Sequence, residues 1–129
     1  MDDLGERLAS AILSVHYHDP QRDYHTWRLL QADGAVQIFD GSAWRSDYAL
    51  SPDDLQRVVQ AVHDCGLPQT GPLHAPDVHD AAVYAIAWAL PDGSRGELVN
   101  HAYPAVKHPA MECLLDLLLD LEEEYSGEL

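Results

Sequence analysis

The sequence has little positive charge. It contains a single lysine, Lys107, and six arginines against 22 aspartates and glutamates, so its formal charge at pH 7 is −15. Surfaces that bind nucleic acids need clustered lysine and arginine side chains to neutralise phosphates, and anionic membranes attract the same residues. The composition therefore argues against nucleic acids and membranes as partners. The composition is compatible with a surface that binds a basic protein. It is equally compatible with an organism whose proteins are acidic in general.

Long apolar runs are also missing. No stretch approaches the roughly 20 consecutive apolar residues of a membrane-spanning helix. Residues 1–6 lack the positive charge with which a secretory signal begins. We therefore expect a cytoplasmic protein. A length of 129 residues with 47% hydrophobic side chains fits a single domain with its own core, covering residues 1–129.

Cysteine is scarce. Cys65 and Cys113 are the only two, and they do not form a Cys-x-x-Cys pair of the kind that binds metal or carries redox chemistry. Isolated cysteines behave as small hydrophobic residues. We therefore expect two buried free thiols.

Catalytic and phosphate-binding motifs are absent as well. The serines lie in no Gly-x-Ser-x-Gly elbow, the eight glycines form no phosphate-binding loop, and no His-Glu-x-x-His sequence occurs. Paired carboxylates of the glycosidase type cannot be located among so many acids. The sequence therefore leans toward a protein that is not an enzyme and needs no cofactor.

Alternating apolar and polar side chains predict β-strands, and Gly, Pro and Asp residues mark the turns between them. Asp33-Gly34 is a strong hairpin signal because both residues tolerate a positive φ. Trp27 and Trp88 fall inside strands, and we expect both in the core. The segment 44–50 is predicted to be irregular chain that leads into a helix. The expected strands cover residues 12–19, 24–31, 35–40, 81–90 and 95–101.

Two helices are predicted, with a short helical turn near residues 2–8. Ser51 and Pro52 are typical of a helix start and Gly66 of a helix end, which predicts a helix between them. The last helix covers 109–124, where leucines occupy more than half of the circumference. So wide an apolar arc indicates either deep burial or contact with another molecule, such as a second copy in a homodimer.

The predicted element order, βββ-α-ββ-α, indicates an α+β fold. We expect an antiparallel sheet of about five strands with two helices packed on one face. Three segments carry a resemblance in outline: LSPDDL at 50–55, DAAVYAI at 80–86 and HPA at 108–110. On these segments and the element order, the chain resembles small bacterial ββαββα domains such as emfourin-like inhibitors of metalloproteases. The resemblance implies this fold and a role in binding proteins rather than in catalysis.

Eight histidines make metal binding an alternative. His16 and His18 are two residues apart on a predicted strand, so both rings project from one face, and His25 on the next strand would lie near them. The alternative is that these histidines are ordinary half-exposed residues of strands and loops and bind no metal. The expected ligands of a divalent metal are His16, His18, His25, His79 and Asp80, with Asp19, His74 and Asp77 as further candidates.

The last predicted helix carries an acidic stripe. Its acids recur every three or four residues with no lysine or arginine among them: Glu112, Asp116, Asp120 and Glu123. Each like-charged pair four residues apart costs roughly 0.2–0.5 kcal/mol, and acids near the helix C-terminus oppose its dipole. The stripe is therefore either a docking surface for a basic partner or a solvated outer face.

The leading hypothesis is a small acidic domain that binds the basic surface of a partner protein, as an inhibitor, an immunity-type protein or a regulatory partner. The binding residues would be the acidic stripe together with Trp44 and Tyr48, because loop aromatics beside charges often anchor interfaces. A metal-binding protein or metal-dependent enzyme is the first alternative. An acidic mimic of DNA that occupies a nucleic-acid-binding protein is the second.

Overall fold

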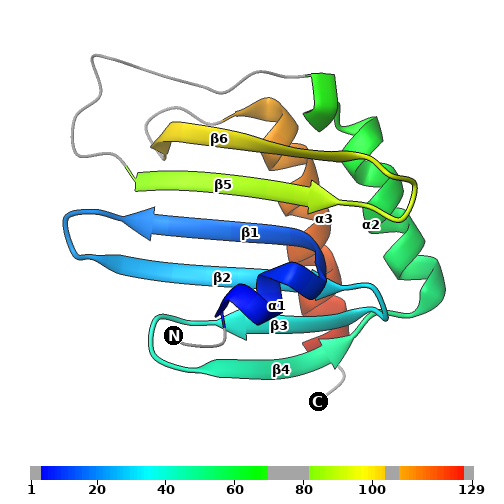
Figure 1. Cartoon of the computed structure of the whole chain (residues 1–129), viewed down its shortest axis with the longest axis horizontal. Helices are drawn as coiled ribbons and strands as arrows, with labels where there is room; N and C mark the ends of the chain where they lie inside the picture. Colours follow the sequence, from blue (N-terminus) through cyan, green and yellow to red (C-terminus); the bar gives the residue numbers. More distant parts are fainter. Residues whose placement is uncertain (1–3, 70–81, 104–107, 127–129) are drawn as a thin grey trace.

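A computed structural model describes residues 4–69, 82–103 and 108–126 of the chain. Six strands form one antiparallel sheet in the order β4-β3-β2-β1-β5-β6 (Figure 1). The strands are β1 (Ala11–Asp19), β2 (Tyr24–Gln31), β3 (Ala35–Phe39), β4 (Trp44–Ala49), β5 (Ala82–Ala89) and β6 (Arg95–Tyr103). The helices are α1 (Leu4–Ser10), α2 (Pro52–Asp64), α3 (Pro109–Ser126) and the 3₁₀ turn η1 (Leu67–Gln69).

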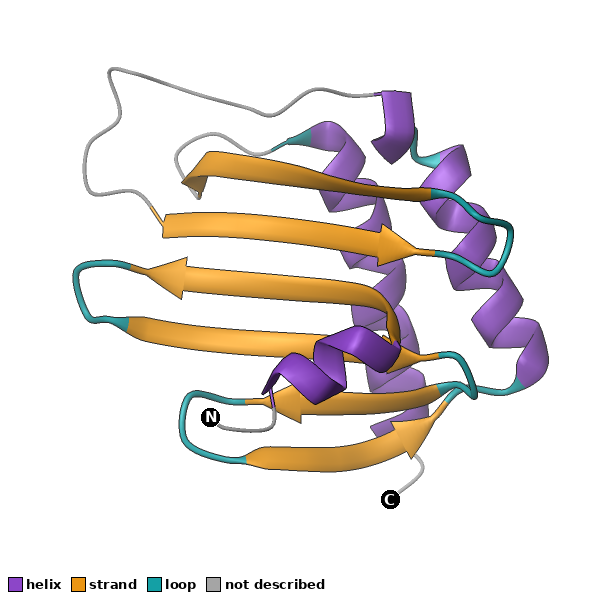
Figure 2. Cartoon of the chain, viewed as in Figure 1, coloured by secondary structure: helices purple, strands orange, loops and turns teal. Residues whose placement is uncertain are grey.

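The fold is α+β, with α2 and α3 side by side on one face of the sheet (Figure 2). This confirms the expected class and the expected helical layer. The short helix α1 crosses the opposite face, where it contacts β1 and β2. We call this second face, which α1 covers only in part, the open face. None of the helices in the described ranges is long and apolar enough to cross a bilayer.

The expectation of about five strands was too low. The segment 44–49, predicted to be irregular, forms the edge strand β4 and pairs with β3. Trp44 lies opposite Phe39, and Tyr48 lies opposite Val36, with a register shift between them. The polar run at 45–47 and this shift interrupt the simple alternation by which the other strands are recognised.

The predicted turn and helix signals are confirmed. Gly34 has a φ of +95°, and a Cβ at this position would lie 2.5 Å from the carbonyl oxygen of Leu50, so glycine is required there. The Ser51 hydroxyl accepts a hydrogen bond of 3.2 Å from the amide of Asp54 at the start of α2. Gly66, with a φ of +82°, follows the end of that helix.

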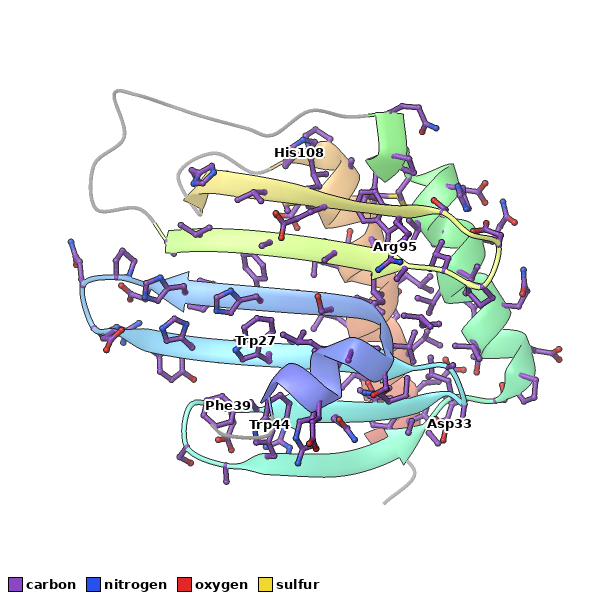
Figure 3. The ribbon with its side chains drawn as sticks, viewed as in Figure 1. Trp27, Asp33, Phe39, Trp44, Arg95 and His108 are labelled. Atoms are coloured by element: carbon purple, nitrogen blue, oxygen red, sulfur yellow. A yellow bond between two sulfur atoms is a disulfide. The ribbon has the colours of Figure 1, made fainter. Side chains whose placement is uncertain are left out.

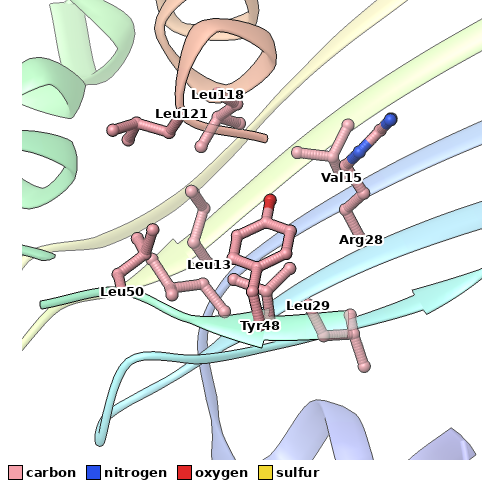
Figure 4. Close-up of a pocket in the computed structure, with 10 residues that line it drawn as sticks. Leu13, Val15, Arg28, Leu29, Tyr48, Leu50, Leu118 and Leu121 are labelled. Atoms are coloured by element: carbon pink, nitrogen blue, oxygen red, sulfur yellow. The ribbon is translucent and has the colours of Figure 1, made fainter. Parts of the chain in front are cut away.

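The core lies between the sheet and the layer of α2 and α3. The leucine arc of α3 is used mainly here, because Met111, Leu114 and Leu121 are almost fully buried. A small gap of about 20 Å³ lies beneath α3, between Leu118 and Leu121 of the helix and Tyr48 of β4 (Figure 4). This is the scale of one water-sized probe, so the gap offers no room for a substrate.

The expectation of free thiols was wrong. Cys65, which ends α2, and Cys113, in the first turns of α3, form a disulfide bond. The two cysteines are 48 residues apart in sequence, but the sheet brings the end of one helix beside the start of the other, with the Cα atoms 5.7 Å apart. Cys65 is half-buried and Cys113 is exposed. The disulfide therefore joins the two helices at the surface.

The two tryptophans predicted to be in the core differ in their positions. Trp88 is 5% exposed and faces the helical layer, as expected. Trp27 is half-buried and lies on the open face, opposite His16 in the register between β1 and β2. Position within a strand does not by itself say which face a side chain occupies. Here the face of Trp27 is shared with histidines.

Candidate functional site

The register of the β1–β2 hairpin gathers three histidines on the open face. His16 and His18 share a face because side chains alternate along a strand. Antiparallel pairing then places His25 opposite His18, and Trp27 opposite His16. The sequence-based expectation that these three histidines lie close together is confirmed.

Four nearly parallel rings lie in series on this face: Trp27 is stacked on His16, and His25 is stacked on His18, while His16 and His25 meet edge to edge (Figure 3 labels Trp27). The ring centroids of Trp27 and His16 are 3.9 Å apart, those of His16 and His25 are 5.1 Å apart, and those of His25 and His18 are 4.0 Å apart. All of these pairs are close to parallel, with interplanar angles of 12° or less. Stacking restricts the rotation of each ring, so the positions of the ring nitrogens are held by the sheet.

His16 is linked to His25 by a hydrogen bond of 2.9 Å between its Nε2 and the Nδ1 of His25. Burial, together with the nearby His25 and His18, lowers the pKa of His16 to about 4. Its ring is therefore neutral at pH 7 and shares one proton with His25 along this bond.

Asp23, in the turn between β1 and β2, completes the cluster. Its Oδ1 lies 3.5 Å from the Nε2 of His25 and 3.6 Å from the Nε2 of His18. One ligand atom from each of the three residues lies within 4.8 Å of the others. The Nε2 of His18 is buried and has no hydrogen-bond partner in the part of the chain that the structure describes.

The structure brings together some of the residues predicted as metal ligands and not others. His18 and His25 belong to the three-residue cluster, whereas His16 contacts it through His25. Asp19 binds the guanidinium of Arg22 at 2.9 Å instead. The loop candidates lie outside the described residues: His74, Asp77, His79 and Asp80.

Sequence reasoning missed Asp23. This residue has a φ of +47°, a left-handed conformation that only Gly, Asn and Asp adopt with any frequency. The turn conformation directs its carboxylate back over the hairpin toward the two histidines. An aspartate directly before a strand that begins Tyr24-His25 was the available signal, but the sequence does not reveal the sign of its φ.

The acidic stripe forms part of the outer face of α3. Asp116, Asp120 and Glu123 are exposed, and Glu112 is half-buried. Among the described ranges, no ion pair involves any of these four residues. The acid of α3 that does form one is Glu122, which binds Arg28 of β2 at 2.9 Å.

An open groove of about 500 Å³ lies along α2, and Leu117 is the one α3 residue among the described side chains that line it. Leu119, in the middle of the stripe, is 49% exposed, a large value for a leucine in a helix. Arg57, a cation in the groove, is held by Asp54 at 2.9 Å. The groove is lined by Asp53, Gln56, Arg57, Gln60, Ala61, Asp64 and Leu117.

The two aromatic candidates do not belong to this surface, nor do they lie together. Trp44 is half-buried and packs against Phe39 on the open side of β4, with the ring planes tilted by 44°. The guanidinium of Arg7 lies 4.5 Å from the centroid of the Trp44 ring. Tyr48 faces the helical layer, where its ring centroid lies 5.3 Å from that of Tyr125. Both therefore have packing partners within the chain.

Comparison with known proteins gives no family assignment. No protein-family model and no curated protein sequence matches the chain. Two surfaces of the described chain carry candidate binding chemistry: the histidine cluster of the open face and the acidic outer face of α3.

Proposed function

We propose that this protein binds a basic partner protein through the outer side of its helical layer. The surface consists of the acidic stripe of α3 with the exposed side chain of Leu119 among its acids. The single observation that carries the proposal is the exposure of Leu119, 49% accessible, in the midst of acids that have no ion-pair partner in the described chain. Protein interfaces typically have an apolar centre surrounded by a polar rim, and Leu119 among the acids of α3 has this arrangement.

The charge of this surface is not balanced locally. The like-charged pairs Glu112–Asp116 and Asp116–Asp120 are four residues apart on one helix, where each pair costs roughly 0.2–0.5 kcal/mol. Elsewhere four arginines are matched by nearby acids: Arg22 by Asp19, Arg28 by Glu122, Arg45 by Asp40 and Arg57 by Asp54. A standing repulsion is relieved when a cationic partner docks, which favours association and speeds encounter.

The side chains of this surface indicate which chemical groups a partner would need. Leu119 lies one helical turn from Asp116 and from Glu123, so a complementary segment would place an apolar side chain over Leu119 and cations on either side. An amphipathic helix with lysine or arginine beside leucine meets this description. The resemblance to small inhibitor domains agrees with such a binding role.

A homodimer through the leucine arc is less favoured as a proposal. Leu114, Leu115 and Leu121 of the arc are buried inside the chain, and Leu117 and Leu118 are half-buried. Leu119 alone of these α3 leucines is strongly exposed. Two copies would also bring two acidic stripes together, which like charges oppose.

A cytoplasmic location also stays a proposal, and the disulfide makes it testable. Cytosolic proteins usually keep their thiols reduced. In that compartment Cys65 and Cys113 would react with an alkylating reagent added during lysis, whereas the disulfide-bonded form described here would not.

The proposed surface is tested with a defined probe, a fluorescent 18-residue helical peptide built only from lysine and leucine. Fluorescence anisotropy measures its dissociation constant at low and at physiological salt. We expect Asp116→Lys with Asp120→Lys to weaken binding by at least about tenfold, and Leu119→Ser to weaken it without changing the salt dependence.

The matched control makes the same change of charge on the other side of the molecule. Glu6 of α1 and Glu97 of β6 are both exposed, so Glu6→Lys with Glu97→Lys alters the net charge equally. The control should retain most of the affinity. Equal losses in the two double variants would show that only net charge matters, and would overturn the proposed surface.

A further inference from the structure

We propose that His18, Asp23 and His25 form a binding site for a divalent transition-metal ion, best suited to Zn²⁺, on the open face of the sheet. This site is separate from the acidic face of α3 and does not depend on the proposed function. Three kinds of observation support it: the spacing of the ligand atoms, the buried and unpartnered nitrogen of His18, and the hydrogen bond that orients His25.

The spacing is that of metal ligands rather than of hydrogen bonds. The Oδ1 of Asp23 lies 3.5 Å from one histidine Nε2 and 3.6 Å from the other. Two atoms bound to the same tetrahedral zinc at about 2.0–2.2 Å are separated by about 3.3–3.6 Å. Hydrogen bonds between such groups would be about 2.7–3.2 Å long. A single ion can therefore bridge Asp23 to both histidines once the stacked rings of His18 and His25, which are 7° from parallel, tilt so that their in-plane lone pairs converge.

The Nε2 of His18 gives a second and independent indication. It is buried, and within the described ranges it has no hydrogen-bond partner. Most buried polar atoms in proteins are satisfied, and exceptions commonly mark a missing water or ion. This nitrogen faces the carboxylate of Asp23, so an ion held by Asp23 would also satisfy His18.

The orientation of His25 is set by His16. The hydrogen bond of 2.9 Å occupies the Nδ1 of His25 and leaves its Nε2 facing Asp23. When Nδ1 carries the proton and donates it to His16, the lone pair of Nε2 is available for a metal. His16 is in turn stacked on Trp27 with a centroid distance of 3.9 Å. We therefore assign His16 as a positioning residue and not as a ligand.

The ligand set points to the class of ion. Two imidazole nitrogens and one carboxylate oxygen suit Zn²⁺ and its first-row neighbours, whereas Mg²⁺ and Ca²⁺ prefer oxygen ligands alone. The Asp23 side chain is 89% exposed, so solvent reaches the cluster and can supply a further ligand. Three protein ligands with one open position are typical of zinc sites that bind an exchangeable molecule.

The experiment is a titration of untagged, chelator-treated protein with Zn²⁺ alone by isothermal calorimetry at pH 7.5, with Co²⁺ absorption as a second readout. We expect one saturable site per chain and the visible spectrum of a four-coordinate nitrogen and oxygen site. His18→Ala, His25→Ala and Asp23→Asn should each weaken binding by about 100-fold or more. Because these side chains lie at the sheet surface, far-UV circular dichroism should be unchanged.

His16 requires a test that separates positioning from packing. His16→Ala should weaken Zn²⁺ binding by about 10–100-fold, the usual effect of removing the group that orients a ligand. His16→Gln offers an oxygen that can accept the proton of His25, and should recover part of this loss. An equal effect of both substitutions would show that His16 does not orient the ligand.

Two controls complete the design. His63→Ala removes another histidine that faces an aspartate, Asp92, at 2.8 Å, and should leave binding unchanged. The double substitution His74→Ala with His79→Ala removes the loop histidines predicted from the sequence. The proposal is overturned if no saturable Zn²⁺ site is found, or if the loop variant abolishes a site that His18→Ala and Asp23→Asn leave intact.

Discussion

The hydroxyl of Tyr125, near the end of α3, donates a hydrogen bond of 2.8 Å to Oδ2 of Asp54 in the first turn of α2. The same hydroxyl accepts a hydrogen bond of 2.8 Å from the amide of Ser51, the residue that caps α2. Tyr125 thus joins the last turn of one helix to the first turn of the other. The disulfide holds these helices together at their opposite ends.

This bridge predicts a pH-dependent effect of Tyr125→Phe. The Tyr125 hydroxyl, helped by Arg57, holds the pKa of Asp54 below its ordinary value. A lowered pKa in the folded state stabilises the protein above the unfolded value and is lost as the pH falls through the folded one. The variant should therefore be less stable than the wild type at pH 7, and the difference should narrow as the pH falls below the ordinary aspartate pKa of about 3.9.

The size of this effect can be measured by urea denaturation. Loss of the hydrogen bond from the Ser51 amide alone should cost about 1 kcal/mol at pH 7. Adding Asp54→Asn to Tyr125→Phe removes the titrating carboxylate, so the part of the pH dependence of stability that comes from Asp54 should disappear. A difference between wild type and Tyr125→Phe that stays constant from pH 7 to pH 2 would contradict the assignment.

Reduction of the Cys65–Cys113 bond should destabilise the protein without changing its fold. The bond closes a loop whose ends are 48 residues apart, and disulfides of this kind contribute about 2–4 kcal/mol, mainly by restricting the unfolded chain. Cys113 is exposed, so a phosphine reductant can reach it in the folded protein. The measurement is the urea midpoint with and without reductant.

The matched control for that experiment is the double variant Cys65→Ser with Cys113→Ser. It should unfold at the midpoint of the reduced wild type, and the reductant should not shift it further. If reduction leaves the wild-type midpoint unchanged, the disulfide contributes nothing to stability.

Asp116→Lys should increase stability while it weakens binding to a basic peptide. Asp116 lies four residues from both Glu112 and Asp120, so the substitution turns two repulsive pairs into two attractive ones. We expect a gain of about 0.5–1 kcal/mol at low salt, which high salt should reduce. Asp116→Asn removes repulsion without adding attraction and should give a smaller gain. A loss of stability in Asp116→Lys would indicate that the stripe has a structural role.

Gly34→Ala should be strongly destabilising. The positive φ of Gly34 disfavours any L side chain, and the added Cβ would meet the carbonyl oxygen of Leu50 at 2.5 Å. The amide of Leu50 also donates a hydrogen bond of 2.8 Å to the carbonyl of Gly34. We expect a loss of at least about 1–2 kcal/mol in thermal or urea unfolding. Gly93→Ala has a similar φ of +90° but nothing within 4 Å, and should cost less.

The local sequence pattern was sufficient to predict most of the helices, strands and turns. The turn at Asp33-Gly34 and the start of α2 at Ser51-Pro52 depend on the conformations of single residues and on hydrogen bonds between near neighbours. The amphipathic period of α3 depends only on its own residues. By contrast, β4 is an edge strand with polar residues at 45–47 and a shifted register, so its strand character appears only beside β3.

The candidate sites divide in the same way. The acidic stripe is visible in the sequence because residues three or four apart share a face of any helix. The exposure of Leu119 within it is not visible, because the leucine arc alone does not say how far α3 rotates onto the sheet. The proximity of His16, His18 and His25 was predicted from the hairpin, but the participation of Asp23 depends on its backbone φ of +47°.

The sequence by itself therefore determines the charge, and interactions between near neighbours determine the hairpins, the helix ends and the α+β class. Residues 48 positions apart are different, because Cys65 and Cys113 meet only after α2 and α3 have packed side by side on the sheet. The same holds for the face on which Trp27 lies and for the convergence of Asp23 on His18 and His25. Register and face are decided by burial of the whole hydrophobic set, which is a property of the assembled sheet and helices.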